Sequence, residues 1–446
     1  MPHKFLSVFR FLPSLLLCLL LSIPALAQPG TDLRANPHGS GDAVQVNTGL
    51  PTTRFTLNAA IEAMRHGHPL LNAAKANQRA AAADTLGAGL WTNPTLDGAY
   101  ARSFVNSQTD PVGSVGIGIT QFLETANVPE ARRATAALYQ RAVETEGETT
   151  VRALAFDVEL ACVALSAAAS KVQLYAESNA ELDRANQIVT ARVKAGAVPQ
   201  YDATRIGVAV AQARAALADA QADMIGARGD LDVAVGADSQ SLVGLPAFDL
   251  FELATPDSLD NALSQARKDR PDIRAAQARA DAAQAQVNVA RRVVFPGFSL
   301  RLGTYFGATP GEFGGMVSVG VPLPVVDRGQ GAIGAALARA EAANFLVEAM
   351  TLQAGQRVRA AWEEAARRRI TLHDYQQTGV TRSQGMVQEA EAGYRAGKLS
   401  VLELVDAYVA KRDARLRAIE LAQDARAADV RLRRAVQAGI TMRNEN

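Results

Sequence analysis

The stretch Thr56–Ala60 reads TLNAA, and 202 residues later the stretch Ser258–Ala262 reads SLDNA. The same offset separates Pro69 from Pro271. A repeat of this length far exceeds the roughly 20 to 50 residues of a solenoid module, so each copy must contain several secondary-structure elements. The predicted organisation is a first repeat at residues 55–241, a linker at 242–257, a second repeat at 258–439 and a tail at 440–446.

The N-terminal residues 1–27 have the pattern of a secretory signal sequence, with an apolar core and a small-x-small cleavage site at Ala25–Ala27. Cys18 lies inside the apolar core, a context that disfavours a lipoprotein. Cys162 is the cysteine left after cleavage, which excludes an intramolecular disulfide. Residues 28–54 are rich in proline and glycine and are predicted to form an extended lead-in.

Charge and hydropathy exclude two classes of protein. The full chain has a formal net charge of +1, and removal of Lys4 and Arg10 with the signal leaves 1 − 2 = −1. This balance provides no electrostatic basis for binding nucleic acid. After residue 27 there is no run of about 20 apolar residues, which excludes a bundle of membrane-spanning helices. If the mature chain crosses a membrane, strands must do so.

Each copy is predicted to open with two helices separated by a prolyl turn, His68-Pro69 in one copy and Arg270-Pro271 in the other. Two runs with strand character then follow in each copy, at residues 95–104 and 114–122 and at residues 298–306 and 316–321. Most are close to the 9 to 11 residues of a tilted membrane strand. The intervening loops contain glycine, which predicts a hairpin in each copy.

A very long helix is predicted after each hairpin, at residues 129–195 and 332–396. About 65 helical residues would span roughly 100 Å. Glycines could divide each tract into two stacked helices, and they are Gly147, Gly355, Gly379 and Gly385.

A matching turn ends each long helix, Ala195–Pro199 and Ala396–Ser400, with glycine at the C-cap position. In the return helix of the first copy, apolar residues from Ile206 to Ala234 alternate spacings of 4 and 3, which predicts a heptad seam. A shift of 201 residues keeps eight of the nine positions apolar, and the exception is Lys411.

Four membrane strands cannot form a closed barrel. An open sheet edge in lipid leaves backbone groups unsatisfied, at several kcal/mol each, so the chain is predicted to assemble. Dimers, trimers and tetramers would have about 8, 12 and 16 strands, and a lumen wide enough for solute disfavours the smallest.

The duplicated order of helices, hairpin, long helix, turn and return helix resembles the outer membrane factor (TolC-like) family of bacterial efflux systems. The resemblance implies a mainly α fold with a small membrane β-barrel portion. It further implies a homotrimer with a 12-stranded barrel in outer-membrane lipid and a coiled-coil tunnel in the periplasm. Its partners would be a periplasmic adaptor (membrane fusion) protein and a proton-driven inner-membrane pump of the RND type.

Within that family, the segment Gly320–Pro324 followed by Asp327–Gly331 is similar to the cobalt-zinc-cadmium heavy-metal resistance branch. The similarity implies heavy-metal cations as cargo and a strand-to-helix junction formed by Pro322, Pro324, Asp327, Arg328 and Gly329. A strand leaving a barrel could favour proline and glycine in other branches, so a multidrug or type I secretion channel is an alternative. The alternative of another class is a periplasmic coiled-coil structural protein.

The resemblance also directs attention to the two turns. It implies that Glu403 and Asp406 narrow the periplasmic entrance, with Asp202 of the first copy as a weaker candidate. Acidic residues also favour the first turn of any helix, which is the structural alternative. The turn residues expected to contact the adaptor are Gly196, Pro199, Gly397 and Ser400.

The sequence predicts neither an enzyme nor a cofactor. It contains no Ser/His/Asp arrangement and no phosphate loop that would indicate catalysis. His66 and His68 are spaced as metal ligands could be, but their counterparts are Lys268 and Arg270, so a polar helix end is favoured over a metal site.

Overall fold

The structure is a computed structural model that describes residues 50–51, 53–102, 113–236, 242–253, 257–307 and 311–437. The chain divides into two units, residues 1–47 and 48–446, and all described residues belong to the second. The predicted signal sequence, almost all of the lead-in, Cys18 and the tail lie outside the described residues.

Each half of the described chain opens with two helices that meet at a proline. These are α1 (Leu57–Gly67) and α2 (Pro69–Ala88), then α5 (Leu259–Asp269) and α6 (Pro271–Val293). The Thr56 hydroxyl accepts a hydrogen bond from the Ala59 amide at 3.2 Å, and Ser258 caps α5 in the same way. Both caps satisfy amide groups that the first helical turn leaves without partners.

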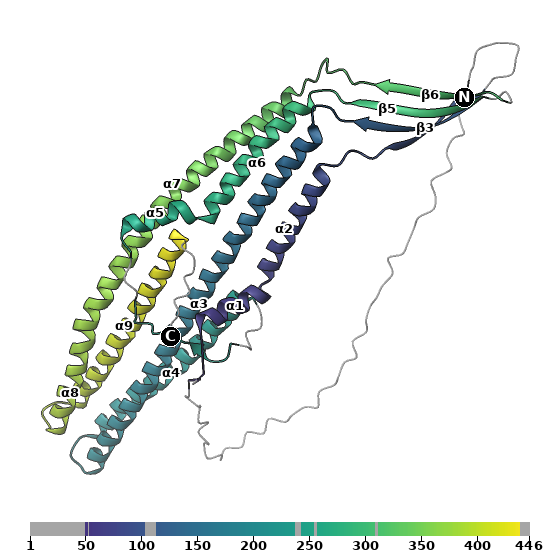
Figure 1. The fold of residues 1–446 in the computed structure, drawn as a ribbon. Coiled ribbons are helices and arrows are strands. Elements are labelled where there is room, and N and C mark those ends of the chain that lie inside the picture. The colour runs from purple at the N-terminus through teal and green to yellow at the C-terminus, as the bar shows by residue number, and fades with distance from the viewer. Residues whose placement is uncertain are drawn as a thin grey trace, which may run out of the picture. The chain divides into compact units, whose positions relative to one another are not determined.

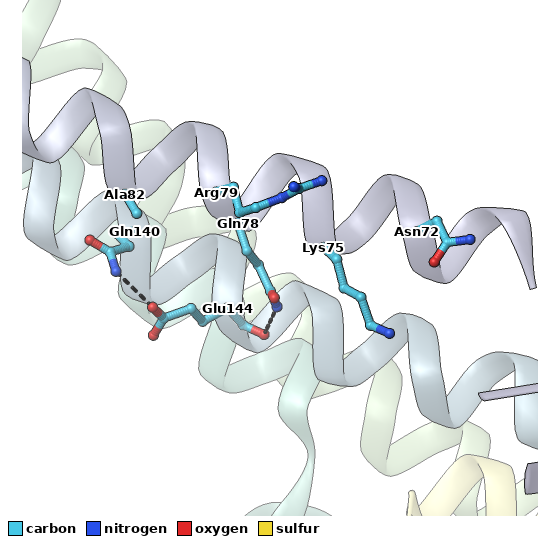
Figure 2. A pocket seen from close by; sticks show the side chains of 7 residues that line it. All are labelled: Asn72, Lys75, Gln78, Arg79, Ala82, Gln140 and Glu144. Carbon is cyan, nitrogen blue, oxygen red and sulfur yellow. Dashed lines mark hydrogen bonds between the residues drawn. The ribbon is translucent and has the colours of Figure 1, made fainter. Parts of the chain in front are cut away.

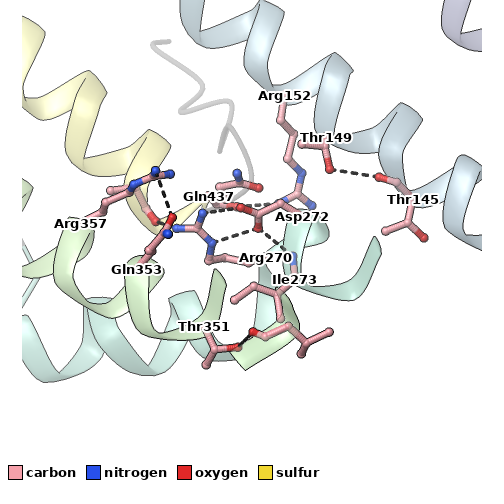
Figure 3. A network of polar contacts seen from close by, with 12 residues as sticks. Thr145, Thr149, Arg152, Arg270, Asp272, Ile273, Thr351, Gln353, Arg357 and Gln437 are labelled. Atoms are coloured by element: carbon pink, nitrogen blue, oxygen red, sulfur yellow. Dashed lines mark hydrogen bonds and ion pairs between the residues drawn. The ribbon is translucent and has the colours of Figure 1, made fainter. Parts of the chain in front are cut away.

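The prolyl turns place His68 and Arg270 in structural roles. The Nδ1 atom of His68 accepts from the Leu70 amide at 3.1 Å and so caps α2. Arg270 is almost fully buried, pairs with Asp272, and donates to the Ala435 carbonyl near the end of α9 (Val401–Val436), as Figure 3 shows in part. A cation near a helix C-terminus is favourable because of the helix dipole.

Four of the described strands form an antiparallel sheet in the order β2-β3-β5-β6. Its members are β2 (Thr95–Arg102), β3 (Gly113–Leu123), β5 (Phe298–Gly307) and β6 (Phe313–Gly320). Both predicted hairpins are therefore present, and the β3–β5 ladder joins them. The last strand starts at Phe313 rather than at residue 316, because the ladder with β5 continues through Gly314 and Gly315.

The linker packs against both halves of the chain. It includes β4 (Leu245–Pro246), which pairs in parallel with β1 (Arg54–Phe55). The Arg228 guanidinium donates to the carbonyl groups of Leu242 and Gly244 at 2.6 and 3.3 Å. The linker is thus held by backbone pairing, by Arg228 and by Arg426 of the last helix, which donates to the Glu252 carbonyl, while Leu242 and Leu250 are buried in the core.

The two long helices differ in continuity. Helix α3 (Val128–Lys194) runs for 67 residues without a break at Gly147. Its counterpart consists of α7 (Gln330–Tyr375), a π-helical segment η2 (Gln376–Val380) and α8 (Thr381–Arg395). Gly379 lies in the π-helical segment, where an added Cβ would come within 2.9 Å of the Tyr375 ring. Gly355 and Gly385 lie within regular helix.

The return helices bury the predicted seam. Helix α4 (Gln200–Val235) buries Ile206, Val210, Ala213, Leu217, Ala220 and Leu231. In α9 the buried counterparts include Ala407, Ala414, Ala418, Leu421, Ala425, Ala428 and Leu432. Alanine at many of these positions lets the helices approach closely, so the heptad pattern was interpreted correctly.

Helices α2, α3, α6 and α7 run side by side in that order, as Figure 1 shows. Within the described part of the chain, α3 packs on both α2 and α6, and α6 packs on both α3 and α7. The order matches that of the connected strands β2, β3, β5 and β6. Among the described helices, α3 is the one that is long and apolar enough to cross a membrane, but 61% of its most apolar window is buried inside the fold, as expected of a core helix.

Candidate functional site

The two helical hairpins end in turns of the same geometry. Gly196 and Gly397 have φ angles of 69° and 71°, values that favour glycine. The Gly196 amide donates to the Val193 carbonyl at 2.9 Å, and the Gly397 amide donates to the Tyr394 carbonyl at 3.1 Å. The sequence therefore identified both turns and the residue on which each depends.

The second turn starts its return helix with a capping box. The Ser400 hydroxyl accepts from the Glu403 amide, and a Glu403 carboxylate oxygen accepts from the Ser400 amide at 2.7 Å. The Ser400 amide and hydroxyl both donate to the Glu403 carboxylate, and these two hydrogen bonds hold the pKa of Glu403 below its ordinary value. Asp406 lies almost one turn further along, and both carboxylates are exposed to solvent. The helix-start explanation therefore holds for Glu403, without excluding a second role.

The first turn starts its return helix differently. Pro199 occupies the N-cap position without a side-chain cap, and the Asp202 amide donates to its carbonyl at 3.1 Å. The Asp202 side chain is partly buried. Burial raises the pKa of Tyr394 above its ordinary value, and the Asp202 charge raises it further. Asp202 of the first hairpin thus lies within electrostatic range of the second.

Arg192 joins the two hairpins near their tips. Its guanidinium donates to the Tyr394 carbonyl at 2.7 Å, and its Cζ lies 4.8 Å from the centre of the Tyr394 ring. Tyr394 itself is only 3% exposed. This contact could not be predicted from the duplication, because the counterparts of Arg192 and Tyr394 in the repeat are Gly393 and Val193.

Lys411 has a partner that explains its position in an otherwise apolar seam. Its Nζ atom donates to a Glu181 carboxylate oxygen on α3 at 2.7 Å. Nearby, the Tyr408 hydroxyl of α9 donates to Glu391 of α8 at 2.6 Å. These residues border a cavity of about 240 Å³ between α3, α8 and α9. A single charged exception in a heptad pattern was the signal that could have located this cluster.

The sheet has one apolar and one polar face. Ten exposed apolar side chains of the described strands share one face, formed by the even positions of β2 and β5 and the odd positions of β3 and β6. They are 49% to 77% exposed and comprise Leu96, Tyr100, Val115, Ile117, Ile119, Leu302, Phe306, Phe313, Val317 and Val319. The opposite face carries mostly glycine and small polar residues, with Phe122, Tyr305 and Met316 as larger apolar exceptions.

Exposure along β3 alternates between the two faces of the sheet. Along β3, Val115, Ile117 and Ile119 are exposed, whereas Gly118 is buried and Thr120 is half-buried. A soluble protein would turn its apolar side chains inward. An apolar outer band and a polar interior are the pattern of a membrane barrel wall.

The predicted strand-to-helix junction connects β6 to α7. Pro322 and Pro324 are exposed. The Gly329 amide donates to the Asp327 carboxylate at 2.9 Å, and the Arg328 amide donates to the Gln330 side chain at 2.7 Å. Gly329 has φ of 72°, and an added Cβ would come within 2.6 Å of Val294, so glycine is required there. In the first copy Asn127 takes the same left-handed N-cap role, which was not predicted from the sequence.

An open groove of about 640 Å³ runs between α2 and α3 (Figure 2). It is lined by Asn72, Lys75, Gln78, Arg79, Ala82, Gln140 and Glu144. The Gln78 side chain reaches the Glu144 carbonyl at 3.5 Å across the groove. The residues come from two helices and contain no arrangement that indicates catalysis.

Among the described residues there is no group of three or more His, Cys, Asp or Glu side chains that could hold a metal ion. His66 is exposed at the end of α1, while His68 caps α2. Cys162 is fully buried in α3, and burial raises its pKa to about 12, so the thiol stays protonated. It is a packing residue.

Comparison with known proteins decides the family. The family model described as outer membrane efflux protein matches residues 60–237 and 262–437, one tract within each copy of the repeat. The chain belongs to the outer membrane efflux protein family. The TolC-like fold and the outer-membrane location expected from the sequence are thereby confirmed.

Relatives and solved structures of this outer membrane efflux protein agree with that assignment. The cobalt-zinc-cadmium resistance protein CzcC of Cupriavidus metallidurans is 28% identical over 241 residues, 52% of this chain and 56% of that protein. The match therefore spans about half of that relative's length. A membrane protein from Pseudomonas aeruginosa has a TM-score of 0.74 at 19% identity, over 93% of this chain and 99% of that one. A crystal structure of CusC has a TM-score of 0.70 at 18% identity, over 92% of this efflux protein and 98% of that chain.

Proposed function

We propose that three copies of this chain form the outer-membrane exit duct of a tripartite efflux system for heavy-metal cations. The duct is a passive conduit with no catalytic role. A periplasmic adaptor connects it to a proton-driven inner-membrane pump of the RND type, which supplies the energy for transport. The resemblance and the fold support the channel, and the relatedness to a metal-resistance protein supports the cargo.

The proposed assembly rests on the two edge strands of the sheet and on the two helices at the ends of the helix row. Strands β2 and β6 are the edges of the sheet, and α2 and α7 are the ends of the matching row of helices. Pairing β6 of one copy with β2 of the next satisfies backbone groups that lipid cannot. Three copies then form twelve strands, the number that the TolC-like resemblance implies.

The internal duplication indicates which faces of α2 and α7 meet between neighbouring copies in the proposed trimer. In α6, Arg274 and Arg279 reach Glu148 and Glu146 of α3 from the face that buries Ala275, Ala282 and Val289. Subtracting 202 from the three buried positions leads to Ala73, Ala80 and Gly87 of α2, all of which are exposed. These three residues form the α2 stripe, which lacks the neighbour that its counterpart has.

Helix α7 offers the complementary face. Within one chain, the Arg279 guanidinium of α6 pairs with Glu146 of α3 and lies 5.5 Å from the centre of the Tyr139 ring. Adding 202 to these two α3 positions leads to Glu341 and Glu348 of α7, and both are exposed. In the proposed trimer, α7 of one copy therefore packs on the α2 stripe of the next, as α3 packs on α6 within one chain.

A bulky residue in the α2 stripe tests the assembly. Ala80→Trp should prevent trimers, because overpacking a close helix contact costs about 1 to 3 kcal/mol at each of the three contacts. Lys75→Trp is the matched control, since Lys75 lines the groove on another face of α2 (Figure 2). Light scattering in detergent measures the mass. Equal assembly of the two variants would contradict the proposed interface.

The hairpin turns form the periplasmic end in this proposal. Glu403 and Asp406 are exposed on one side of α9, so three copies would place six carboxylates near the axis, where they attract cations. Asp202 supports the closed arrangement from the first hairpin through its proximity to Tyr394. The turns at Gly196, Pro199, Gly397 and Ser400 are the proposed contacts of the adaptor, and their paired geometry supports two equivalent docking positions per chain.

Deletion of the gene separates the proposed cargo from its rival. The heavy-metal proposal predicts increased sensitivity to divalent metal ions and unchanged sensitivity to drugs. Complementation with the full chain should restore tolerance. Unchanged metal tolerance with increased drug sensitivity would identify a multidrug duct instead. Recovery of the protein in the soluble periplasmic fraction without detergent would point to a structural coiled-coil protein.

A further inference from the structure

The polar face of the sheet carries an isolated pair of opposite charges. Among the described strand residues, Asp97 of β2 and Arg301 of β5 are the charged side chains on this face. The Asp97 Oδ2 and Arg301 Nε atoms are 3.9 Å apart. The two side chains are 37% and 29% exposed, so water reaches both.

The pair reaches across an intervening strand. Asp97 lies opposite Gly118 of β3, and Arg301 lies opposite Thr120 two residues along the same strand. The Thr120 hydroxyl donates to the Asp97 carboxylate and fixes its orientation. A Cβ on Gly118 would come within 3.0 Å of the Arg301 Nε atom. The absence of a side chain at Gly118 therefore allows the guanidinium to approach Asp97.

The duplication shows that the fold does not require this pair. An offset of 202 makes Ser299 the counterpart of Asp97 and Ala99 the counterpart of Arg301. The ladders form with neutral residues at both counterpart positions, Ser299 in the β5–β6 ladder and Ala99 in the β2–β3 ladder. The Arg301 Nε atom is also buried without a hydrogen-bond partner among the described residues, so its local environment is not optimised for stability.

We propose that Asp97 and Arg301 determine the charge selectivity of the strand-lined part of the duct. This inference rests on the proposed trimeric channel, in which the polar face lines the lumen. Three pairs then form a ring of three carboxylates and three guanidinium groups. Arg301 offsets the charge of Asp97, so small ions of either sign pass the ring, and loss of either partner leaves a ring of one sign.

The size of the effect follows from Coulomb's law. A unit charge acts on an ion at about 10 Å in water strongly enough to change its local concentration about twofold. Three unbalanced charges should change the ratio of cation to anion permeability several-fold at low salt. The effect should diminish above about 0.1 M salt, where the screening length falls to about 10 Å.

Reversal potentials of the full chain in planar bilayers under a potassium chloride gradient test the proposal. Arg301→Gln should raise the ratio of cation to anion permeability several-fold, and Asp97→Asn should lower it by a similar factor. The double variant should return to the wild-type ratio. Arg102→Gln is the matched control, because it removes the same charge from the opposite face of β2 and should leave the ratio unchanged.

The outcomes distinguish this inference from the function on which it rests. If the wild type forms channels and neither single variant changes the permeability ratio, the proposed role of the pair is overturned and the proposed duct is not. A wild-type protein that forms no channels would overturn both. Asp97→Asn keeps the shape of the side chain and its hydrogen bond from Thr120, so it keeps the test decisive if Arg301→Gln fails to assemble. An equal change in Arg102→Gln would also count against the proposal.

Discussion

The guanidinium of Arg192 at the end of α3 donates to the backbone carbonyl of Tyr394 at the end of α8, at 2.7 Å. The bond joins the two hairpins close to their turns, where Gly196 and Gly397 have equivalent left-handed conformations. In the proposed duct, one side chain therefore links the first and second helical hairpins of each chain at the periplasmic aperture. Hydrogen bonds from charged groups contribute about 1.5 to 3 kcal/mol.

Loss of this bond should favour the open aperture. We expect Arg192→Ala to shift the balance toward open channels by about tenfold or more, because about 1.4 kcal/mol corresponds to a tenfold change in an equilibrium constant. Single-channel recordings in planar bilayers would show higher mean conductance. Lys194→Ala is the matched control, since Lys194 is an exposed cation at the same helix end. Identical recordings for the two variants would argue against the link.

The carboxylates beside the second turn should attract cations at the aperture. Glu403→Ala combined with Asp406→Ala should weaken block by divalent cations, measured as the concentration that halves the conductance. Ser400→Ala separates this effect from capping, because it removes the N-cap hydroxyl but retains both charges. That control should lose about 1 kcal/mol of stability and keep its cation block. Unchanged block in the double variant would leave only the helix-start role.

The capping box predicts a pH dependence of stability. Hydrogen bonds from Ser400 lower the pKa of Glu403 in the folded protein below the ordinary value of 4.5. The folded state therefore holds the proton less tightly than the unfolded state, and the stabilisation is fully present above about pH 4.5. It is lost as the pH falls through the lower, folded value. The melting temperature of the wild type should exceed that of Glu403→Gln at neutral pH, and the difference should shrink below pH 4.5. A difference that grows on acidification would contradict the assignment.

The Lys411–Glu181 pair should be strongly coupled. Their side chains are 19% and 24% exposed, so removal of one partner leaves a poorly solvated charge. Lys411→Ala should cost about 1 to 3 kcal/mol of unfolding free energy. Lys411→Met combined with Glu181→Gln should recover most of that cost, because a partly buried pair can be replaced by neutral residues of similar size. Denaturant unfolding of Lys411→Met, Glu181→Gln and the double variant measures the coupling, and additive losses would exclude it.

Much of the fold was predictable from the duplication, because the same pattern occurs twice and each copy checks the other. The prolines at 69 and 271, the two turn glycines and the heptad seam each correspond to a boundary or buried face in the structure. These features depend on local geometry and on periodicity. Local geometry and periodicity both depend on residues that are close together in the sequence.

The contacts between elements were less predictable. Arg192 and Tyr394 have no equivalent in the other copy, so the comparison that identified the turns could not identify their link. Asp97 and Arg301 are far apart in the sequence. They approach each other because their strands, β2 and β5, pair with opposite edges of β3. The π-helical segment at Gln376–Val380 was expected only as one of several possible breaks, since three other glycines lie in regular helix.

Assembly of three chains is the central claim, because the lumen, the aperture and the charged ring all depend on it. Native mass spectrometry of the full chain extracted from outer membranes in mild detergent tests that claim directly. The account predicts a dominant species with three times the mass of the mature chain. A dominant monomer, dimer or tetramer under conditions that keep the protein folded would contradict it.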